Sequence, residues 1–210
     1  MNFLTRIFHK NQQPQQAASN WAQRLFRDLR DVFYVLAVFM LVYVLFFRVI
    51  VVEGSSMNQT LIDGDRLLLV SNLLYSNPKQ GDVIVASKES FRGGECIIKR
   101  VIATEGQVVD INFSSRTVYV DGTPLKESYV YFAPNDSRPL LQEGMRFPLT
   151  VEEGCVFAMG DNRNDSKDSR HPDIGLIDRR EILGRAVLVM LPGIREGADS
   201  ADFGRIGVIN

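Results

Sequence analysis

One apolar run limits what this chain can fold into. Residues 32–47 carry no charge and are almost wholly apolar. A helix of that length spans about 24 Å, which is less than the ~30 Å hydrocarbon core of a bilayer. Extending the segment through Arg48 to Val52 supplies the missing length, because an arginine side chain can reach the membrane interface. We therefore predict a single transmembrane anchor over residues 32–52. A cleaved signal peptide is disfavoured, since the run is long and no Ala-x-Ala site follows it.

Basic residues gather before this run. Residues 1–31 hold five Lys/Arg and two Asp, a net charge of +3, whereas the chain after Arg48 holds 18 Lys/Arg and 23 Asp/Glu. An excess of Lys/Arg beside a span marks the cytoplasmic side. We predict that residues 1–31 form a cytoplasmic tail, disordered to about residue 18 and basic and amphipathic from Trp21. The remainder is then extracytoplasmic. The overall net charge of −1 gives no reason to expect nucleic acid as a partner.

After the anchor the apolar pattern is typical of short β-strands. We predict strands over residues 66–70, 83–86, 97–103, 108–111, 117–120, 156–159 and 186–191. Asp121-Gly122 follows one of them and is a strong hairpin signal. The predicted fold class is mainly β: one all-β domain over residues 53–192 on a single N-terminal helix, with a mobile tail over 193–210. Two cysteines, Cys96 and Cys155, are too few for a disulfide framework, and we interpret both as small buried residues.

Two adjacent serines, Ser55 and Ser56, follow the anchor. A serine hydroxyl is a weak nucleophile unless a nearby base takes its proton. Histidine is the usual base, but His9 lies in the predicted cytoplasmic tail and His171 lies in a loop before Pro172. A Ser-His-Asp arrangement would depend on His171.

A lysine can replace histidine if it is uncharged. Lys99 lies in a predicted strand, where alternation places Ile97, Lys99 and Val101 on one face. If that face is inward, desolvation lowers the pKa of the lysine and favours the neutral amine. A strand-edge lysine that reaches water is the other interpretation, and the pattern alone leaves both open.

A polar segment over residues 160–170 (GDNRNDSKDSR) follows another predicted strand. It is not a calcium loop, because Arg163 takes a ligand position and Ser166 takes the place of the required glycine. It could be a solvated charged loop. Alternatively, Ser166 could orient an uncharged lysine, while Asp161, Asp168 and Arg170 brace the segment by ion pairing.

Together these segments resemble the bacterial type I signal peptidases, in their small Gram-positive-like form. Those enzymes are membrane-bound serine proteases with a Ser-Lys dyad. The resemblance extends from the anchor to about Pro192. It is carried by residues 54–61 (GSSMNQTL), 64–65 (GD) with 81–85 (GDVIV), 98–102 (IKRVI) and 160–170.

The resemblance implies roles for these residues. Ser56 would be the nucleophile and Lys99 the general base, oriented by Ser166. Asp161, Asp168 and Arg170 would hold the floor of the site. The backbone N–H of Ser56 would stabilise the oxyanion, and Gly54 stands where some members have a serine that donates as well. The whole supporting set is Gly54, Asp161, Ser166, Asp168 and Arg170.

The resemblance also implies substrates and surroundings. The substrates would be secretory preproteins with small residues at −1 and −3, bound as an added strand near residues 82–85 and Lys99. The protein would be a single-pass protein of the cell membrane, packed on the outer leaflet of the lipid bilayer. No metal, small-molecule cofactor or nucleic acid would be needed. Gln59 stands where a proline is usual.

Two further functions stay open on the sequence. A Ser-Lys self-cleaving protease shares the dyad, but it would need a DNA-binding module that residues 1–31 are too short to form. A non-catalytic, membrane-tethered peptide-binding β domain would carry the same residues without hydrolysis.

Overall fold

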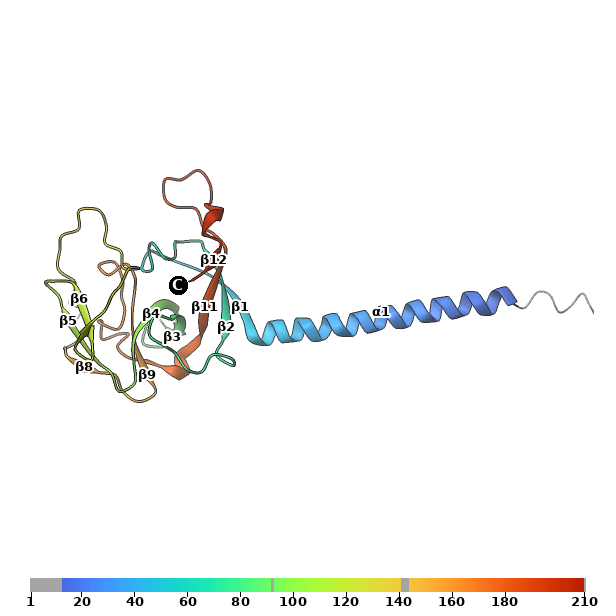
Figure 1. Ribbon diagram of the computed structural model, residues 1–210, viewed down its shortest axis with the longest axis horizontal. Helices are drawn as coiled ribbons and strands as arrows, with labels where there is room; N and C mark the ends of the chain where they lie inside the picture. Colours follow the sequence, from blue (N-terminus) through green and yellow to red (C-terminus); the bar gives the residue numbers. More distant parts are fainter. Residues whose placement is uncertain (1–12, 92, 141–143, 210) are drawn as a thin grey trace, which may run out of the picture. The chain divides into compact units, whose positions relative to one another are not determined.

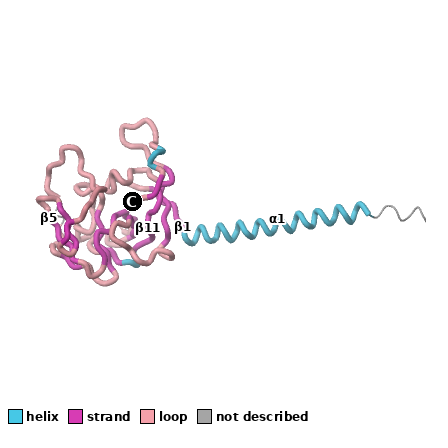
Figure 2. Tube along the Cα trace, in the orientation of Figure 1, coloured by secondary structure: helices cyan, strands magenta, loops and turns pink. Residues whose placement is uncertain are grey.

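The computed structural model describes residues 13–91, 93–140 and 144–209 (Figures 1 and 2). The chain divides into two compact units, Met1–Leu45 and Phe46–Asn210. Each unit is described by itself.

The first unit is built on one long helix, α1 (Gln13–Phe46). Its segment Asn20–Phe46 is long and apolar enough to cross a membrane. The apolar side chains along it, from Trp21 to Leu45, are exposed, so no protein core covers them. Such a helix fits a single-pass membrane anchor. Residues 13–18 are helical, contrary to the predicted disorder; the earlier part of the predicted tail lies outside the described residues.

The helix ends earlier than the anchor we predicted. Strand β1 (Phe47–Val51) follows at once and pairs antiparallel with β2 (Arg66–Ser71), with Phe47 opposite Val70 and Val51 opposite Arg66. The expectation that the span continues to Val52 is therefore wrong. Three successive β-branched residues, Val49 to Val51, favour a strand once a partner strand is present.

The second unit contains one large sheet. Its strand order is β1-β2-β11-β3-β4-β9-β10, with β12 paired to β11. The new members are β3 (Val83–Ser87), β4 (Cys96–Thr104), β9 (Cys155–Met159), β10 (Ile177–Asp178), β11 (Ile182–Leu191) and β12 (Gly207–Val208). Neighbouring strands are antiparallel throughout.

A smaller sheet has the order β7-β6-β5-β8. Its strands are β5 (Val108–Asn112), β6 (Thr117–Val120), β7 (Thr123–Pro124) and β8 (Leu149–Thr150). The predicted hairpin between β6 and β7 is confirmed, since Asp121 and Gly122 both have positive φ, at 51° and 74°. Two residues with positive φ are typical of the tight turn that matches strand twist.

All seven predicted strands are present, and the mainly β class is confirmed. Within the described part of the chain, the helices after α1 are single 3-10 turns, η2 (Arg179–Glu181) and η3 (Phe203–Arg205). The sequence missed β1 and the two-residue strands, which are too short to show a period of two. It also placed the start of β11 at Ala186, four residues late.

The hydrophobic core that borders the site is shared by distant segments. Val52 and Met57, on either side of the two serines, pack in one cluster with Leu67, Val85 and Ile209. Ile209 is only 7% exposed, and β12 pairs with β11. The predicted mobile tail is therefore wrong for residues 207–209. The interpretation of both cysteines as buried is also wrong, because Cys96 is exposed and Cys155 half-buried; both are free thiols.

Candidate active site

The candidate nucleophile lies on a loop with a closed base, residues 52–65, which we call the serine loop. The N–H of Val52 donates to Asp65 O at 2.8 Å, and the N–H of Gly64 donates to Val52 O at 2.9 Å. Met57 is buried beneath the loop, whereas its neighbour Ser56 is half-buried. The fold thus presents the Ser56 hydroxyl at the surface of a well-packed element.

Gly54 lies in the exposed part of this loop. Its φ of +86° lies in the left-handed region that favours glycine, and its N–H donates to Asp63 Oδ1 at 2.7 Å. With no side chain, Gly54 can offer no second side-chain donor to an oxyanion.

Strand β4 brings the candidate base to this loop. Lys99 Nζ lies 2.8 Å from Ser56 Oγ, within hydrogen-bonding distance, and also donates to Ile98 O at 3.0 Å. The lysine is only 4% exposed. Of the two interpretations left open by the sequence, the structure supports the inward-facing lysine. Burial of this kind penalises the ammonium form relative to the neutral amine.

Asp168 is the centre of the polar loop, residues 160–170. It accepts from Gly160 N at 3.0 Å, from Ser166 Oγ at 2.9 Å and from Arg170 Nε and Nη2 at 2.8 Å each. Burial opposes ionisation of the carboxyl, but the Arg170 guanidinium outweighs burial and holds the pKa of Asp168 below its ordinary value. The predicted Asp168–Arg170 ion pair is therefore formed.

The hydroxyl of Ser166 donates to Asp168, whereas we expected it to bond to Lys99. Ser166 also packs tightly on Gly160: a Cβ at Gly160 would lie 2.2 Å from Ser166 Oγ and 2.5 Å from Ser56 O. Glycine is therefore needed where the polar loop touches the serine loop.

Asp161 finds its partner outside the polar loop. Arg100 of β4 bonds to it through two nitrogens, Nε to Oδ1 at 2.9 Å and Nη2 to Oδ2 at 2.7 Å. These side chains are 1% and 0% exposed. Thr60 of the serine loop donates to the same carboxylate at 2.6 Å. The sequence did not predict a role for Arg100 or Thr60. For Arg100 one signal was available, because an arginine inside a strand predicted to be buried needs a partner for its charge.

Asn162 holds the peptide before the nucleophile and was also missed. Its backbone N–H donates to Ser56 O and its Nδ2 to Ser55 O, both at 3.1 Å. Asp165 accepts a hydrogen bond from the Ser55 hydroxyl. The Ser55 carbonyl and the Ser56 N–H belong to one trans peptide and point in opposite directions. Asn162 therefore fixes the direction of the Ser56 N–H, which points away from it.

A groove of about 650 Å³ adjoins the two candidate catalytic residues. It lies between residues 50–57 and the start of β4, and Ile97, Lys99, Phe91 and Lys167 are among its lining residues. In the described chain, β9 pairs with β4 only from Arg100 onward, so Cys96–Ile98 present an edge of β4 that β9 leaves uncovered.

Family comparison identifies the protein class. A family model described as "Signal peptidase, peptidase S26" matches residues 25–191, about four-fifths of the chain. The chain belongs to the signal peptidase family.

Similar proteins include a probable signal peptidase I-1 of Synechocystis, 36% identical over 70% of this chain and 72% of its own length. Signal peptidase I T of Bacillus subtilis is 34% identical over 70% of this chain and 75% of its own length. A solved signal peptidase I of Enterococcus faecalis is 30% identical, with a TM-score of 0.41 over 52% of this chain and 96% of that one.

The edge that a peptide could join differs from the one we expected for a signal peptidase. Strand β3, which includes Val83–Val85, lies between β11 and β4 and has a partner on each side. Strand addition beside residues 82–85 is therefore wrong. The uncovered edge at Cys96–Ile98 borders the groove instead.

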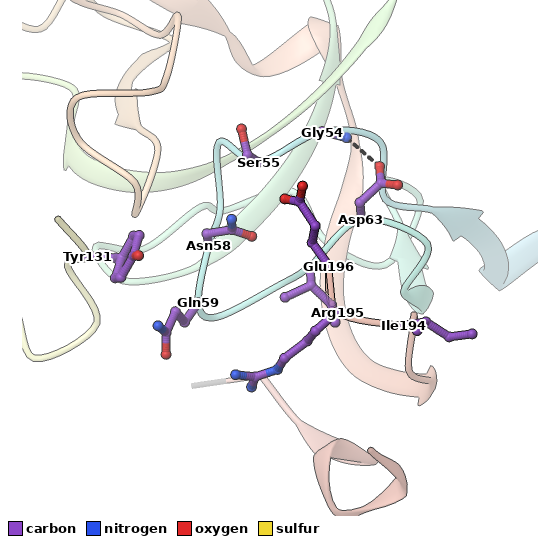
Figure 3. A pocket seen from close by; sticks show the side chains of 10 residues that line it. Gly54, Ser55, Asn58, Gln59, Asp63, Tyr131, Ile194, Arg195 and Glu196 are labelled. Atoms are coloured by element: carbon purple, nitrogen blue, oxygen red, sulfur yellow. Dashed lines mark hydrogen bonds between the residues drawn. The ribbon is translucent and has the colours of Figure 1, made fainter. Parts of the chain in front are cut away.

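A second pocket, of about 340 Å³, lies at the serine loop of this signal peptidase (Figure 3). It shares Gly54 and Ser55 with the groove. Figure 3 shows the Gly54–Asp63 hydrogen bond, and Asn58 and Glu196, the latter from the C-terminal segment, among the lining side chains.

The other candidate base is placed elsewhere. The Nδ1 of His171 accepts from Asp173 N at 3.1 Å and lies 3.6 Å from Asp173 Oδ2. The Ser56 hydroxyl thus meets Lys99 and not His171, and His9 lies outside the described residues. Among residues 13–91, 93–140 and 144–209, no group of three or more His, Cys, Asp or Glu could hold a metal ion.

Proposed function

We propose that this signal peptidase is a membrane-bound serine endopeptidase that removes N-terminal signal peptides from exported preproteins. Ser56 is the nucleophile and Lys99 the general base. The observation that carries the proposal is the 2.8 Å contact between Lys99 Nζ and Ser56 Oγ, made by a lysine that is almost fully buried. A hydroxyl next to a buried amine is the arrangement that serine activation by lysine requires.

In the first step, neutral Lys99 accepts the Ser56 proton while Ser56 Oγ attacks the scissile carbonyl carbon. One N–H of Lys99 donates to Ile98 O, and this bond holds the direction of the amine. The lone pair of the amine is then available for the serine proton. The carbonyl oxygen becomes an oxyanion.

The backbone N–H of Ser56 stabilises this oxyanion. One such donor typically lowers the barrier by about 3–4 kcal/mol. Its direction is fixed by Asn162 through the Ser55 carbonyl. Gly54 adds no side-chain donor.

Collapse of the tetrahedral intermediate breaks the peptide bond. The leaving amine takes the proton from Lys99, which becomes neutral again and then activates water to hydrolyse the acyl-enzyme. Each step is a proton transfer or an acyl transfer between substrate, water, Ser56 and Lys99. The mechanism uses no metal and no organic cofactor.

The polar loop supports the dyad indirectly. Asp168, with Arg170 and Ser166, holds Gly160 against the Ser56 carbonyl, and Asp161 joins Arg100 to the serine loop through Thr60. We assign Ser166 to this support through its bond to Asp168.

The substrate peptide lies in the groove as an extra strand on the edge Cys96–Ile98. Alternate side chains of a strand point to the same face, so the residues at −1 and −3 both enter the groove beside Lys99. Small side chains there let the scissile carbonyl approach Ser56.

The catalytic unit lies on the extracytoplasmic side of the lipid bilayer. The support for this orientation is the net charge of +3 before the apolar segment, since Lys/Arg flanks remain in the cytoplasm. Exported preproteins present their cleavage sites on the side of the membrane away from the cytoplasm.

The test is cleavage of a preprotein by the full chain in detergent micelles. Ser56→Ala and Lys99→Ala should each lower kcat by at least about a thousandfold, because residues of a catalytic unit depend on one another. Lys126→Ala, at an exposed lysine, is the matched control and should cleave as wild type does. Normal cleavage by folded Lys99→Ala would refute the proposal. Binding without cleavage by wild type would support the peptide-binding alternative, and cleavage of the enzyme's own chain alone would support the self-cleaving one.

The pH dependence gives an independent check. The reaction needs the neutral amine of Lys99. We therefore expect kcat/KM to rise between about pH 6 and about pH 9, because the ammonium loses its proton as the pH rises. The check is the initial rate across this range, with circular dichroism to confirm that the protein stays folded. A rate that falls over the same range would contradict a lysine base.

A further inference from the structure

The C-terminal segment, residues 193–209, reaches back to the serine loop. Arg205 donates to both oxygens of Asp65, Nη1 to Oδ1 at 2.7 Å and Nη2 to Oδ2 at 2.8 Å. Its Nη2 also lies 3.2 Å from Thr60 O. The two side chains of the ion pair are 11% and 0% exposed. This segment lies beyond residue 191, where the match to the family model ends.

Asp65 converts this contact into a restraint on the loop. Its carboxylate also accepts from Ile62 N at 2.9 Å and from Gly193 N at 2.8 Å. Its own backbone oxygen accepts from Val52 N at the base of the loop. Asp65 therefore ties both ends of the serine loop to the C-terminal segment.

Thr60 carries the restraint towards the reacting groups. Its carbonyl accepts from Arg205, and its hydroxyl donates to Asp161, the partner of Arg100. Arg100 follows Lys99 directly in β4. Arg205 thus holds the serine loop from one side, while Asp161 and its neighbours hold it from another.

The segment is anchored on both sides of Arg205. Ile209 donates its N–H to Val187 O at 3.0 Å and packs in the core with Val52 and Met57. Gly193 touches the loop so closely that a Cβ there would lie 2.1 Å from Asp63 O. Arg205 is placed between these two fixed points.

We propose that Arg205 is a positioning residue, which fixes the serine loop so that Ser56 stays within reach of Lys99. The inference rests on the proposed function. It assigns a role in catalysis to a residue that does not touch the substrate. A misplacement of about 1 Å in a catalytic group can cost about a hundredfold in rate, so loss of this restraint should lower kcat.

The experiment measures kcat and KM of the full chain with a preprotein substrate in detergent micelles. Arg205→Ala should lower kcat at least about tenfold and change KM by less than about threefold, because the lining of the groove is kept. Arg205→Lys should recover part of the loss, since an ammonium can meet Asp65 but lacks the planar fork. Ethylguanidinium added to Arg205→Ala should raise its kcat. Arg180→Ala is the matched control, since Arg180 is exposed and pairs with Asp178, and it should behave as wild type.

Wild-type kcat in Arg205→Ala together with a lower melting temperature would overturn the inference, because Arg205 would then only stabilise the fold. If Arg205→Ala does not fold, the double variant Asp65→Asn/Arg205→Met decides, since it removes the buried charges and keeps the volume. A folded double variant with lowered kcat supports the inference, and one with wild-type kcat overturns it. Failure of the proposed function would appear differently, as cleavage that survives Ser56→Ala.

Discussion

Individual residues in this signal peptidase are held by buried charges that satisfy one another. Arg100 bonds to Asp161, Arg170 to Asp168 and Arg163 to Glu127, and all three arginines are buried. Breaking such a pair leaves a charge without its partner in a medium of low polarity, which costs more than the intact pair contributes. The chain thus keeps three buried ion pairs in the unit that carries Lys99.

Asp161→Asn tests this at one residue. The substitution leaves Arg100 buried without its carboxylate, so the free energy of unfolding should fall by about 3–5 kcal/mol. Urea denaturation followed by circular dichroism measures it. Asp199→Asn, at an exposed carboxylate, is the control and should leave the midpoint unchanged. Equal midpoints for Asp161→Asn and wild type would show that the buried pair adds no stability.

Asp168 predicts how stability changes with pH. Its folded pKa is held below the ordinary value by Arg170, so the folded state binds fewer protons than the unfolded state. The stabilisation is complete above the unfolded pKa of about 3.9 and is lost as pH falls through and below it. Wild type should therefore lose stability below about pH 5, and the gap between wild type and Asp168→Asn should narrow there. Urea denaturation at several pH values tests this. A stability difference between wild type and Asp168→Asn that stays constant from about pH 7 down to about pH 3 would contradict it.

Single elements are shaped by turns as much as by strands. The β6–β7 hairpin depends on Asp121 and Gly122 in the left-handed region, and Gly54 in the serine loop also has a positive φ. Only glycine takes such angles without a steric penalty. Each turn sets the register of the strand or loop after it, so the cost of a wrong residue extends beyond its own position.

Gly122→Ala measures that cost in the hairpin. Open space surrounds the position, with nothing within 4 Å of an added Cβ, so the effect comes from the φ of +74° alone. We expect a loss of about 1 kcal/mol in the free energy of unfolding. Gly207→Ala also meets open space but lacks the positive φ, and it should cost nothing. Thermal or urea denaturation of both variants tests this, and equal losses in the two would refute the explanation by φ.

The chain consists of two units that differ in whether their apolar side chains are buried. The helix α1 exposes apolar side chains along its length, whereas the three core clusters of the second unit contain only residues from Ile50 onward. The second unit therefore has the burial that an independent domain needs.

A chain that begins at Phe46 should consequently fold alone. Its melting temperature should lie within about 4 °C of that of the full chain in detergent, since that shift corresponds to about 1 kcal/mol for a domain of this size. Scanning calorimetry of the two proteins makes the comparison. Loss of a cooperative transition in the shorter chain would show that α1 is part of the folding unit.

The sequence by itself determined the local features. Periodicity gave the apolar helix and seven strands, Asp121-Gly122 gave a hairpin, and alternation placed Lys99 on one face with Ile97 and Val101. These are properties of neighbouring residues, which short windows contain. The spacing of the motifs indicated Ser56 and Lys99 as a pair, through resemblance to a family and not through geometry.

Only the tertiary structure decided which distant groups meet. Lys99 reaches Ser56 across 43 positions and Arg205 reaches Asp65 across 140, and neither pairing leaves a trace in local pattern. In the structure, residues 47–51 belong to the sheet and not to the anchor. The Ser166 hydroxyl donates to Asp168, and the C-terminal segment packs in the core. The physical reason is the same in each case. A strand edge, a buried carboxylate and an apolar side chain all need partners, and close packing of the whole chain decides which partner is near.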